Sequence, residues 1–246
     1  MVDKGRAERT IRLALDMVRQ VFNFAATNGI YSGANPAAGK VKRPNADNRR
    51  VRYLTEAEAD TLLVALKEKS PDTHDQALLS LNTGLRAGEI FSLTWADVNF
   101  EDVTLLIKDT KSGRNRHAFM TERVRDMLKA RPEGKPGNLV FPNMAGGRIK
   151  QVSNSFDRVV DELKFNEGIT DRRQRLTFHC CRHTFASRLV ERGVDIYHVK
   201  ELLGHQTIEL TARYSHLSPA SLRAAVDVLE KRDSVTEPPA VADKTA

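Results

Sequence analysis

Apolar residues recur at intervals of three or four along most of the chain, the spacing that places side chains on one face of a helix. The first such stretch predicts an N-terminal helix, and its apolar stripe consists of Ile11, Leu15, Val18, Phe22 and Ala25. Further apolar residues lie between these positions and widen the stripe beyond one face. We therefore expect this helix to pack on several sides, against other helices or against the main domain.

A capping box formed by Thr55 and Glu58 predicts the start of the next helix. The apolar face behind it consists of Ala59, Leu62, Leu63 and Leu66. A second helix is expected over residues 74–82 and should end at Gly84, because glycine readily adopts the left-handed conformation that closes a helix. A third helix opens at Arg86, so Gly84 fixes the corner from which the Arg86 side chain projects.

Two short runs, 103–108 and 114–119, are β-branched or alternating and are separated by a turn that contains Gly113. This pattern predicts a β-hairpin. A further short strand is expected over 139–141, and another helix over 152–163. The fold class is therefore mainly α with a small antiparallel β-sheet, an α+β domain.

Two of the most informative polar residues, His179 and Arg182, stand three apart at the start of an apolar-periodic segment. On a helix they are neighbours on one face. A second helix, from about Asp195, should stop at Gly204, for the same reason as the helix that ends at Gly84. That stop leaves His205 on a fixed turn.

A third short helix, capped by Thr207, is expected to carry Tyr214. Tyr214 follows His205 by nine residues, so helices that fold back can bring both side chains to one pocket. A further helix with an apolar stripe should begin at Ser218, whereas residues 233–246 have the composition of a disordered tail. Two histidines, an arginine and a phenol in one segment indicate phosphate chemistry.

These motifs resemble those of the tyrosine recombinases, the phage-integrase family. The family's box of histidine, two residues and arginine stands here at 179–182 (HCCR), its Leu-Gly-His box at 203–205, and its tyrosine at position 214. Residues 83–90 (TGLRAGEI) resemble the family's first arginine box, and Lys111 resembles its hairpin lysine. The resemblance covers about residues 53–217. It departs from the family at the two cysteines, where Asp or Gly followed by Leu is common.

The resemblance implies the tyrosine-recombinase catalytic-domain fold, with catalytic roles for Arg86, Lys111, His179, Arg182, His205 and Tyr214. Tyr214 would attack phosphorus and form a 3′-phosphotyrosine link, with His179 assisting the loss of its proton. Arg86 and Arg182 would bind the non-bridging phosphate oxygens through their planar guanidinium groups. Lys111 would protonate the leaving 5′ oxygen, and His205 would add a hydrogen bond to the phosphate.

Each of these residues also has a structural reading. Alone, Tyr214 would more often be a half-buried packing residue, and Arg86 a surface ion-pair partner; only the combination favours catalysis. Lys108 lies close to Lys111 and is the alternative general acid. Glu89, one turn after Arg86, would either orient a basic group of the site or form a surface helix pair, and the surface pair is the preferred reading.

Composition adds a basic balance, with 39 Lys and Arg against 32 Asp and Glu and a net charge of +7. This suits a polyanionic partner without requiring one. The adjacent Cys180 and Cys181 give neither a disulfide framework nor a metal-binding spacing, so we interpret them as packing residues and expect no metal and no cofactor. The chain starts with an amphipathic helix and has no apolar run of membrane-spanning length, which favours a cytoplasmic, nucleoid-associated protein of a bacterial or phage-infected cell.

Four segments are expected along the chain. They are 1–38, the last helix of a core-binding domain whose earlier helices are missing; 39–52, a basic linker; 53–232, the catalytic domain with its C-terminal helix; and 233–246, the tail. The linker would lie along DNA phosphates or be a solvated loop. The candidate DNA-binding residues are Lys42, Arg43, Arg49, Arg50, Arg114 and Arg116.

The function predicted from the resemblance is metal-independent, site-specific DNA strand exchange by the integrase of a phage or another mobile element. The partners implied are double-stranded DNA attachment sites, a homotetramer on DNA in which protomers exchange their C-terminal segments, and accessory DNA-bending proteins. A tyrosine-using topoisomerase shares the chemistry and is the enzymatic alternative. A DNA-binding regulator that has lost catalysis is the alternative from another class.

Overall fold

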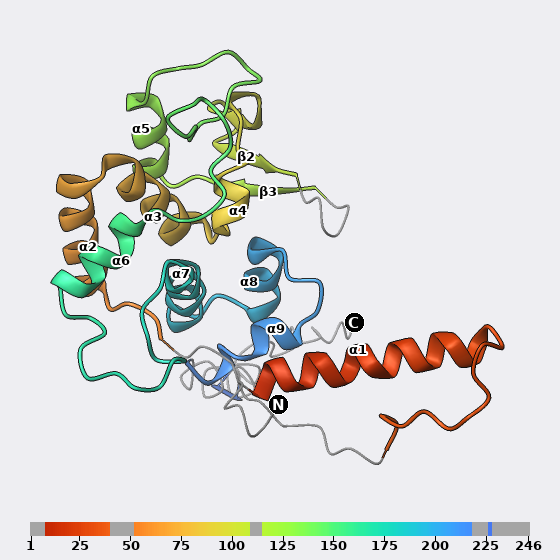
Figure 1. Ribbon diagram of the computed structural model, residues 1–246. Coiled ribbons are helices and arrows are strands. Elements are labelled where there is room, and N and C mark those ends of the chain that lie inside the picture. Colours follow the sequence, from red (N-terminus) through yellow and green to blue (C-terminus); the bar gives the residue numbers. More distant parts are fainter. Residues whose placement is uncertain (1–7, 40–51, 109–114, 218–225, 228–246) are drawn as a thin grey trace, which may run out of the picture. The chain divides into compact units, whose positions relative to one another are not determined.

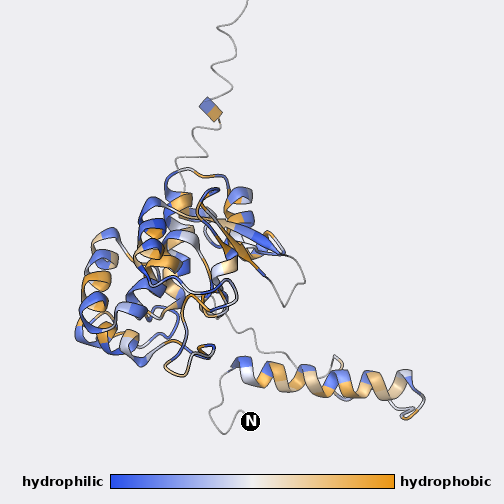
Figure 2. Cartoon of the chain, turned by 90° about the horizontal axis from the view of Figure 1, so that it is seen from above, coloured by the Kyte–Doolittle hydropathy of each residue, from blue (hydrophilic) through white to orange (hydrophobic). Residues whose placement is uncertain are grey.

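The computed structural model describes residues 8–39, 52–108, 115–217 and 226–227, and it divides the chain into two compact units, 1–51 and 52–246 (Figure 1). In the first unit, helix α1 (Glu8–Thr27) is followed by a segment that folds back on it. The Arg19 guanidinium donates to the carbonyl of Ala37 at 2.6 Å, and Asn35 donates to the carbonyl of Arg19 at 3.0 Å. Every residue of α1 keeps some solvent exposure, and apolar residues are spread along its length (Figure 2).

Four helices form the helical layer of the second unit: α2 (Glu56–Lys69), α3 (Pro71–Thr83), α6 (Asn154–Glu162) and α7 (His179–Glu191) (Figure 1). Helix α3 packs against both α2 and α7. The predicted capping box is confirmed, because Thr55 Oγ1 accepts from the Glu58 amide and the Glu58 carboxylate accepts from the Thr55 amide. Helix α3 begins three residues earlier than predicted, at Pro71, because the first turn of a helix tolerates a residue without an amide hydrogen.

A three-stranded antiparallel sheet with the order β1-β2-β3 completes the α+β fold, and the fold class is as predicted. The strands are β1 (Val98–Asn99), β2 (Thr104–Ile107) and β3 (Arg116–Phe119). Both strands of the predicted hairpin are present, with Ile107 opposite Arg116, whereas the connection 109–114 lies outside the described residues. The strand predicted over 139–141 is reduced to a single bridge between Leu139 and Thr94.

Shorter elements link these layers: α4 (Ala87–Ile90), the 3₁₀ turn η2 (Trp95–Asp97), α5 (Glu122–Ala130), α8 (Ile196–Leu203), α9 (Glu209–Ala212) and η3 (Ser215–Leu217). The predicted helix ends at Gly84 and Gly204 are confirmed, with φ of 69° and 64°. The predicted cap at Thr207 is wrong: α9 begins at Glu209, one residue later than a cap at Thr207 would place it, and its N-cap is Ile208, without a side-chain hydrogen bond. The Thr207 hydroxyl bonds the Glu209 carboxylate instead.

Two hydrophobic clusters hold the second unit together. The larger lies between α2, α3, the sheet and α6, and the smaller consists of Ala186, Val190, Val199, Leu203 and Tyr214. The smaller cluster joins α7 to α8 and to the segment after α9. A tyrosine that was singled out for chemistry is therefore also a core residue, 6% exposed.

Gly84 offers a stability test, because it combines a left-handed backbone with close neighbours. A Cβ at this position would lie 2.6 Å from the Phe185 ring and 2.9 Å from Leu203. Gly84→Ala should lower the free energy of unfolding by about 2–4 kcal/mol, from left-handed strain plus overpacking. Gly193→Ala is the matched control, since Gly193 has φ of 81° with nothing within 4 Å, and should lose only about 1 kcal/mol. Urea midpoints at constant m value measure both; equal losses would contradict the packing argument.

Candidate active site

Arg182 on α7 is held between the ends of two helices. Its guanidinium donates to the carbonyl of Gly84 at 2.5 Å and to the carbonyl of Leu203 at 2.7 Å, while only 2% of the residue is exposed. These carbonyls belong to the C-terminal ends of α3 and α8, where the helix dipole favours a positive charge. Burial, and then the charge of Arg86, lower the pKa of Arg182 to about 9, so the group is still charged at neutral pH.

Glu89 connects two further arginines. Its carboxylate accepts from the Arg86 guanidinium at 2.9 Å and from both terminal nitrogens of Arg116, at 3.1 and 3.0 Å. Burial alone would raise the pKa of Glu89, but the hydrogen bond and charge of Arg116, followed by those of Arg86, outweigh it and hold that pKa below its usual value. The helix pair with Arg86 that the sequence favoured is present, but its carboxylate does not lie at the surface, because the Glu89 side chain is only 13% exposed.

Arg116 also bridges the sheet to the end of α8. A Cβ built on Gly204 would lie 2.7 Å from the Arg116 side chain, so the absence of a side chain at Gly204 makes room for this arginine. With 14% of its side chain exposed and its terminal nitrogens on Glu89, Arg116 lies within the arginine cluster of the site. Its predicted role in DNA binding stays a prediction.

His205 follows the Gly204 turn, and its Nδ1 lies 2.8 Å from the hydroxyl oxygen of Thr211, which is fully buried. Burial, and then the charges of Arg182, Arg86, Arg213 and Arg116, lower the pKa of His205 to about 3. The imidazole is therefore neutral at pH 7. Arg182, which contacts the Leu203 carbonyl, and Arg86, at the N-cap of α4, are the two largest of these charges.

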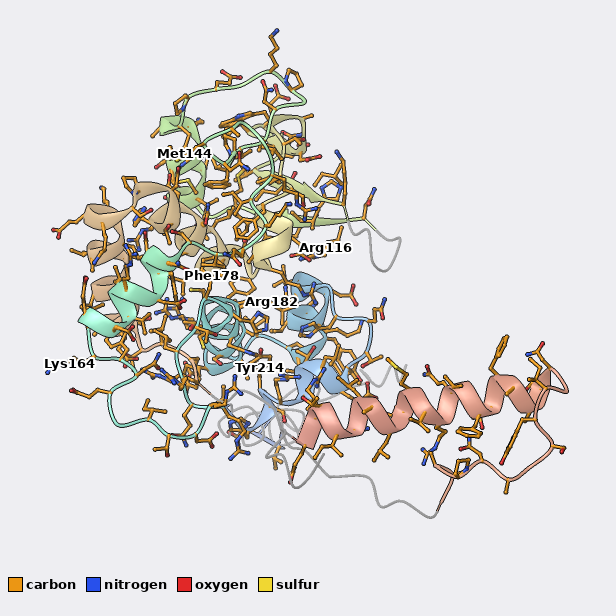
Figure 3. All side chains as sticks on the ribbon, viewed as in Figure 1. Arg116, Met144, Lys164, Phe178, Arg182 and Tyr214 are labelled. Carbon is orange, nitrogen blue, oxygen red and sulfur yellow. The ribbon has the colours of Figure 1, made fainter. Side chains whose placement is uncertain are left out.

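The Tyr214 hydroxyl contacts the Nδ1 atom of His183, one turn after His179 on α7. The His183 ring packs edge-on against the His179 ring, with centroids 4.7 Å apart. Burial raises the pKa of Tyr214 to about 12, although the positive charges of Arg213 and Arg182 act in the opposite direction. Figure 3 labels Arg116, Arg182 and Tyr214, which follow one another from the sheet past α7 toward α9.

Arg86, Arg182, His205 and Tyr214 are therefore brought into one electrostatically coupled cluster, and His179 lies at its edge through its contact with His183. Lys111 lies outside the described residues, as do the candidate DNA-binding residues Lys42, Arg43, Arg49, Arg50 and Arg114. Lys108, the alternative general acid, pairs with the buried Asp97 at 2.6 Å.

Cys180 and Cys181 are both fully buried in the larger hydrophobic cluster, which confirms the interpretation of them as packing residues. Burial raises the pKa of the Cys181 thiol well above its usual value. In the described part of the chain, no group of three or more His, Cys, Asp and Glu residues is arranged to hold a metal ion. None of the described helices combines the length and apolarity of a membrane span.

Sequence reasoning missed His183 and Thr211. His183 stands four residues after His179, the spacing that places both on one helix face, and this was the available signal. Thr211 stands three residues before Tyr214, and its sequence position alone indicates no contact with His205.

A helical α+β domain with a small antiparallel sheet, in which Arg182 and His183 are buried on the helix that packs against Tyr214, agrees with the tyrosine-recombinase fold that the sequence motifs implied. The chain belongs to the phage integrase family, whose model matches residues 52–221. It is 28% identical over 229 residues to the tyrosine recombinase XerA of Pyrococcus furiosus. This alignment covers 91% of this chain and 75% of that protein.

Solved structures agree with this assignment. The catalytic domain of the bacteriophage HP1 integrase is similar, with a TM-score of 0.57, 28% identity, and coverage of 75% of this chain and 98% of that one. The Tn1549 transposon integrase, solved in complex with transposon right end DNA, has the same fold, with a TM-score of 0.73 and 24% identity, covering 94% of this chain and 82% of that one.

Proposed function

We propose that this protein cleaves and rejoins DNA strands at specific sites through a 3′-phosphotyrosine intermediate, and so integrates or excises a phage or another mobile element. The observation that carries the proposal is the position of the buried Arg182, which is held at the Leu203 carbonyl, two residues before His205, while Leu203 and Tyr214 pack in the same buried cluster. A phosphate bound at this point would meet a nucleophile and its charge-neutralising groups together.

In the proposed reaction Tyr214 attacks phosphorus, and the 5′ oxygen leaves. Arg86 and Arg182 neutralise the charge that builds on the non-bridging oxygens, which is the work a metal ion would otherwise do. Their positions are set by different groups: Glu89 holds Arg86, and two helix-end carbonyls hold Arg182. Lys111 is proposed to protonate the leaving oxygen, as the resemblance implies.

His205 is proposed to donate a hydrogen bond to the phosphate from its Nε2 atom. A neutral imidazole carries one proton, and the Thr211 hydroxyl can donate only to an Nδ1 that lacks it. The contact itself fits either tautomer, because a hydroxyl can also accept from an Nδ1 proton; we propose the one in which the Thr211 hydroxyl donates to Nδ1 and the imidazole proton stays on Nε2, where it can reach a ligand. Neutrality also prevents a further positive charge from repelling the arginines.

Thr211→Val tests this tautomer argument, because valine keeps the shape of threonine and removes the hydroxyl. We expect strand cleavage to slow by about tenfold, since one hydrogen bond of about 1.4 kcal/mol is lost from the group that orients His205. Thr211→Ser, which keeps the hydroxyl, should cleave at nearly the wild-type rate. Single-turnover cleavage at saturating DNA measures both, and equal rates for valine and serine would remove Thr211 from the mechanism.

The remaining partners are proposals of the same kind. Residues 1–38 are proposed to belong to a core-binding domain, because α1 leaves large apolar residues exposed that other helices could cover. Met17 and Phe24 are 68% and 66% exposed. Residues 39–52 are proposed to be a linker along the DNA. A homotetramer that exchanges its C-terminal segments, accessory DNA-bending proteins and a cytoplasmic, nucleoid-associated location follow from the resemblance alone.

Covalent capture of DNA tests the function. The purified protein is incubated in EDTA with short duplexes tiled across the genome that encodes it, each with one nick, so that the cleaved 5′-hydroxyl fragment diffuses away. We expect an SDS-resistant adduct on a small set of sequences, of which the most efficient is called the captured duplex below. Binding without an adduct would favour the regulator, and relaxation of unrelated supercoiled plasmid would favour the topoisomerase.

A further inference from the structure

The phenol hydroxyl that is proposed to attack DNA is in contact with a histidine that the family resemblance does not assign. His183 Nδ1 bonds the Tyr214 hydroxyl, and the two residues are 5% and 6% exposed. Their rings lie 5.8 Å apart between centroids, with a tilt of 54°. Tyr214 is enclosed by the apolar residues of α7 and α8 in the smaller cluster. The contact is therefore part of a packed interior.

A buried phenol is a poor nucleophile until its proton is removed. Burial raises the pKa of Tyr214 to about 12. The positive charges of Arg213 and Arg182 lower this pKa, and the nearby Cys180 raises it slightly. At pH 7 the hydroxyl is therefore almost wholly protonated. A general base must lie within hydrogen-bond reach of the proton that it takes. His183 meets this condition through Nδ1, and its ring is also in T-shaped contact with the ring of the exposed His179.

We propose that His183 is the proton acceptor for Tyr214, a proposal that rests on the strand-cleavage function proposed above. As the bond from Tyr214 Oη to phosphorus forms, the O–H bond breaks and its proton passes to Nδ1 of a neutral His183. The bond from phosphorus to the 5′ oxygen breaks, and that oxygen takes a proton from the general acid. In rejoining, the 5′ hydroxyl attacks phosphorus and gives its proton to the deprotonated general acid, while the bond from phosphorus to Tyr214 Oη breaks and His183 returns its proton to the departing phenolate.

His179 then acts beside this pair. Its ring meets the His183 ring at 81°, so it limits how the His183 ring can turn about its own side chain. The assistance by His179 that the resemblance implies is compatible with this geometry as orientation of His183 or contact with the phosphate. Direct acceptance of the phenol proton is assigned to His183.

The first test compares His183→Ala with the wild-type protein on the captured duplex, as single-turnover cleavage at saturating DNA. We expect the rate at pH 7 to fall by about 10²–10⁴-fold, with DNA affinity unchanged. The remaining rate should rise tenfold per pH unit between pH 7 and 9, because the ionised fraction of a phenol with a pKa of about 12 rises by that factor. Added imidazole should restore part of the rate by occupying the space left by the ring.

His198→Ala is the matched control, since His198 is an exposed histidine on α8 outside the cluster, and it should keep the wild-type rate and pH profile. Thermal melting identifies any loss that comes from unfolding. His183→Gln, which fills more of the site, provides a second variant if the alanine form melts early, and it should show the same tenfold rise per pH unit.

The outcomes separate this proposal from the function on which it rests. A wild-type adduct, combined with a His183 variant that is folded and either unimpaired or impaired equally at every pH, would overturn the proton transfer alone. The proton transfer to His183 would also be overturned if His179→Ala, and not His183→Ala, showed the tenfold rise per pH unit and the rescue by imidazole. Failure of the wild-type protein to form any adduct would overturn both.

The contact itself is tested without DNA: in ¹⁵N-histidine-labelled protein the His183 Nδ1 resonance should shift in Tyr214→Phe, and an unchanged resonance would count against the proposal.

Discussion

Tyr214→Phe should abolish the covalent adduct while leaving binding to the captured duplex within about twofold of wild type. Phenylalanine keeps the ring that packs against α7 and α8, so the smaller hydrophobic cluster is preserved. Only the hydroxyl is lost, and its oxygen is the one proposed to attack phosphorus. Adduct formation on SDS gels and binding by fluorescence anisotropy measure the two effects separately.

The same substitution should lower the free energy of unfolding by about 1–3 kcal/mol, because His183 is left without its phenol partner in the interior. Tyr197→Phe is the matched control, since Tyr197 on α8 is 64% exposed and loses an identical hydroxyl. It should form the adduct normally and keep wild-type stability. An adduct that persists in Tyr214→Phe would place the nucleophile elsewhere in the chain and would contradict the central assignment.

Local rules explain why much of this site was predictable. The capping box at Thr55 and the left-handed glycines at 84 and 204 depend on backbone geometry that short sequence patterns encode. Those two glycines end α3 and α8, and the carbonyls at these ends are the ones that hold Arg182. The glycines that end α3 and α8 therefore also set the position of Arg182, although the sequence alone does not show that these helix ends meet at this arginine.

Contacts across the fold explain the rest. Glu89 was assigned to a surface pair because its partner at three residues' distance is visible in the sequence, whereas Arg116, 27 residues away on β3, is not. His183 was overlooked because the motif match selects His179, and only the packing of Tyr214 into the smaller cluster distinguishes the two rings. Lys111 falls outside the described residues, so its role stays a prediction.

Arg182→Lys should impair both stability and cleavage. The arginine satisfies two helix-end carbonyls 119 residues apart in sequence, Gly84 and Leu203, through one rigid guanidinium. A lysine ammonium is a single point donor and cannot span both carbonyls in this geometry. With one or both buried carbonyls left unpaired, at about 1–3 kcal/mol each, we expect the free energy of unfolding to fall by about 2–5 kcal/mol.

Cleavage should fall by about 10²–10³-fold at saturating DNA, the usual cost of removing one preorganised donor from a developing oxyanion. Arg188→Lys, on the same helix, is the control: its guanidinium donates to one carbonyl, that of Thr55, at 3.2 Å and lies outside the cluster. It should lose no more than about 1 kcal/mol and cleave normally. If Arg182→Lys proved as stable as Arg188→Lys, the two helix ends would be held together by apolar packing alone, and the argument that one buried charge joins the fold to the chemistry would fail.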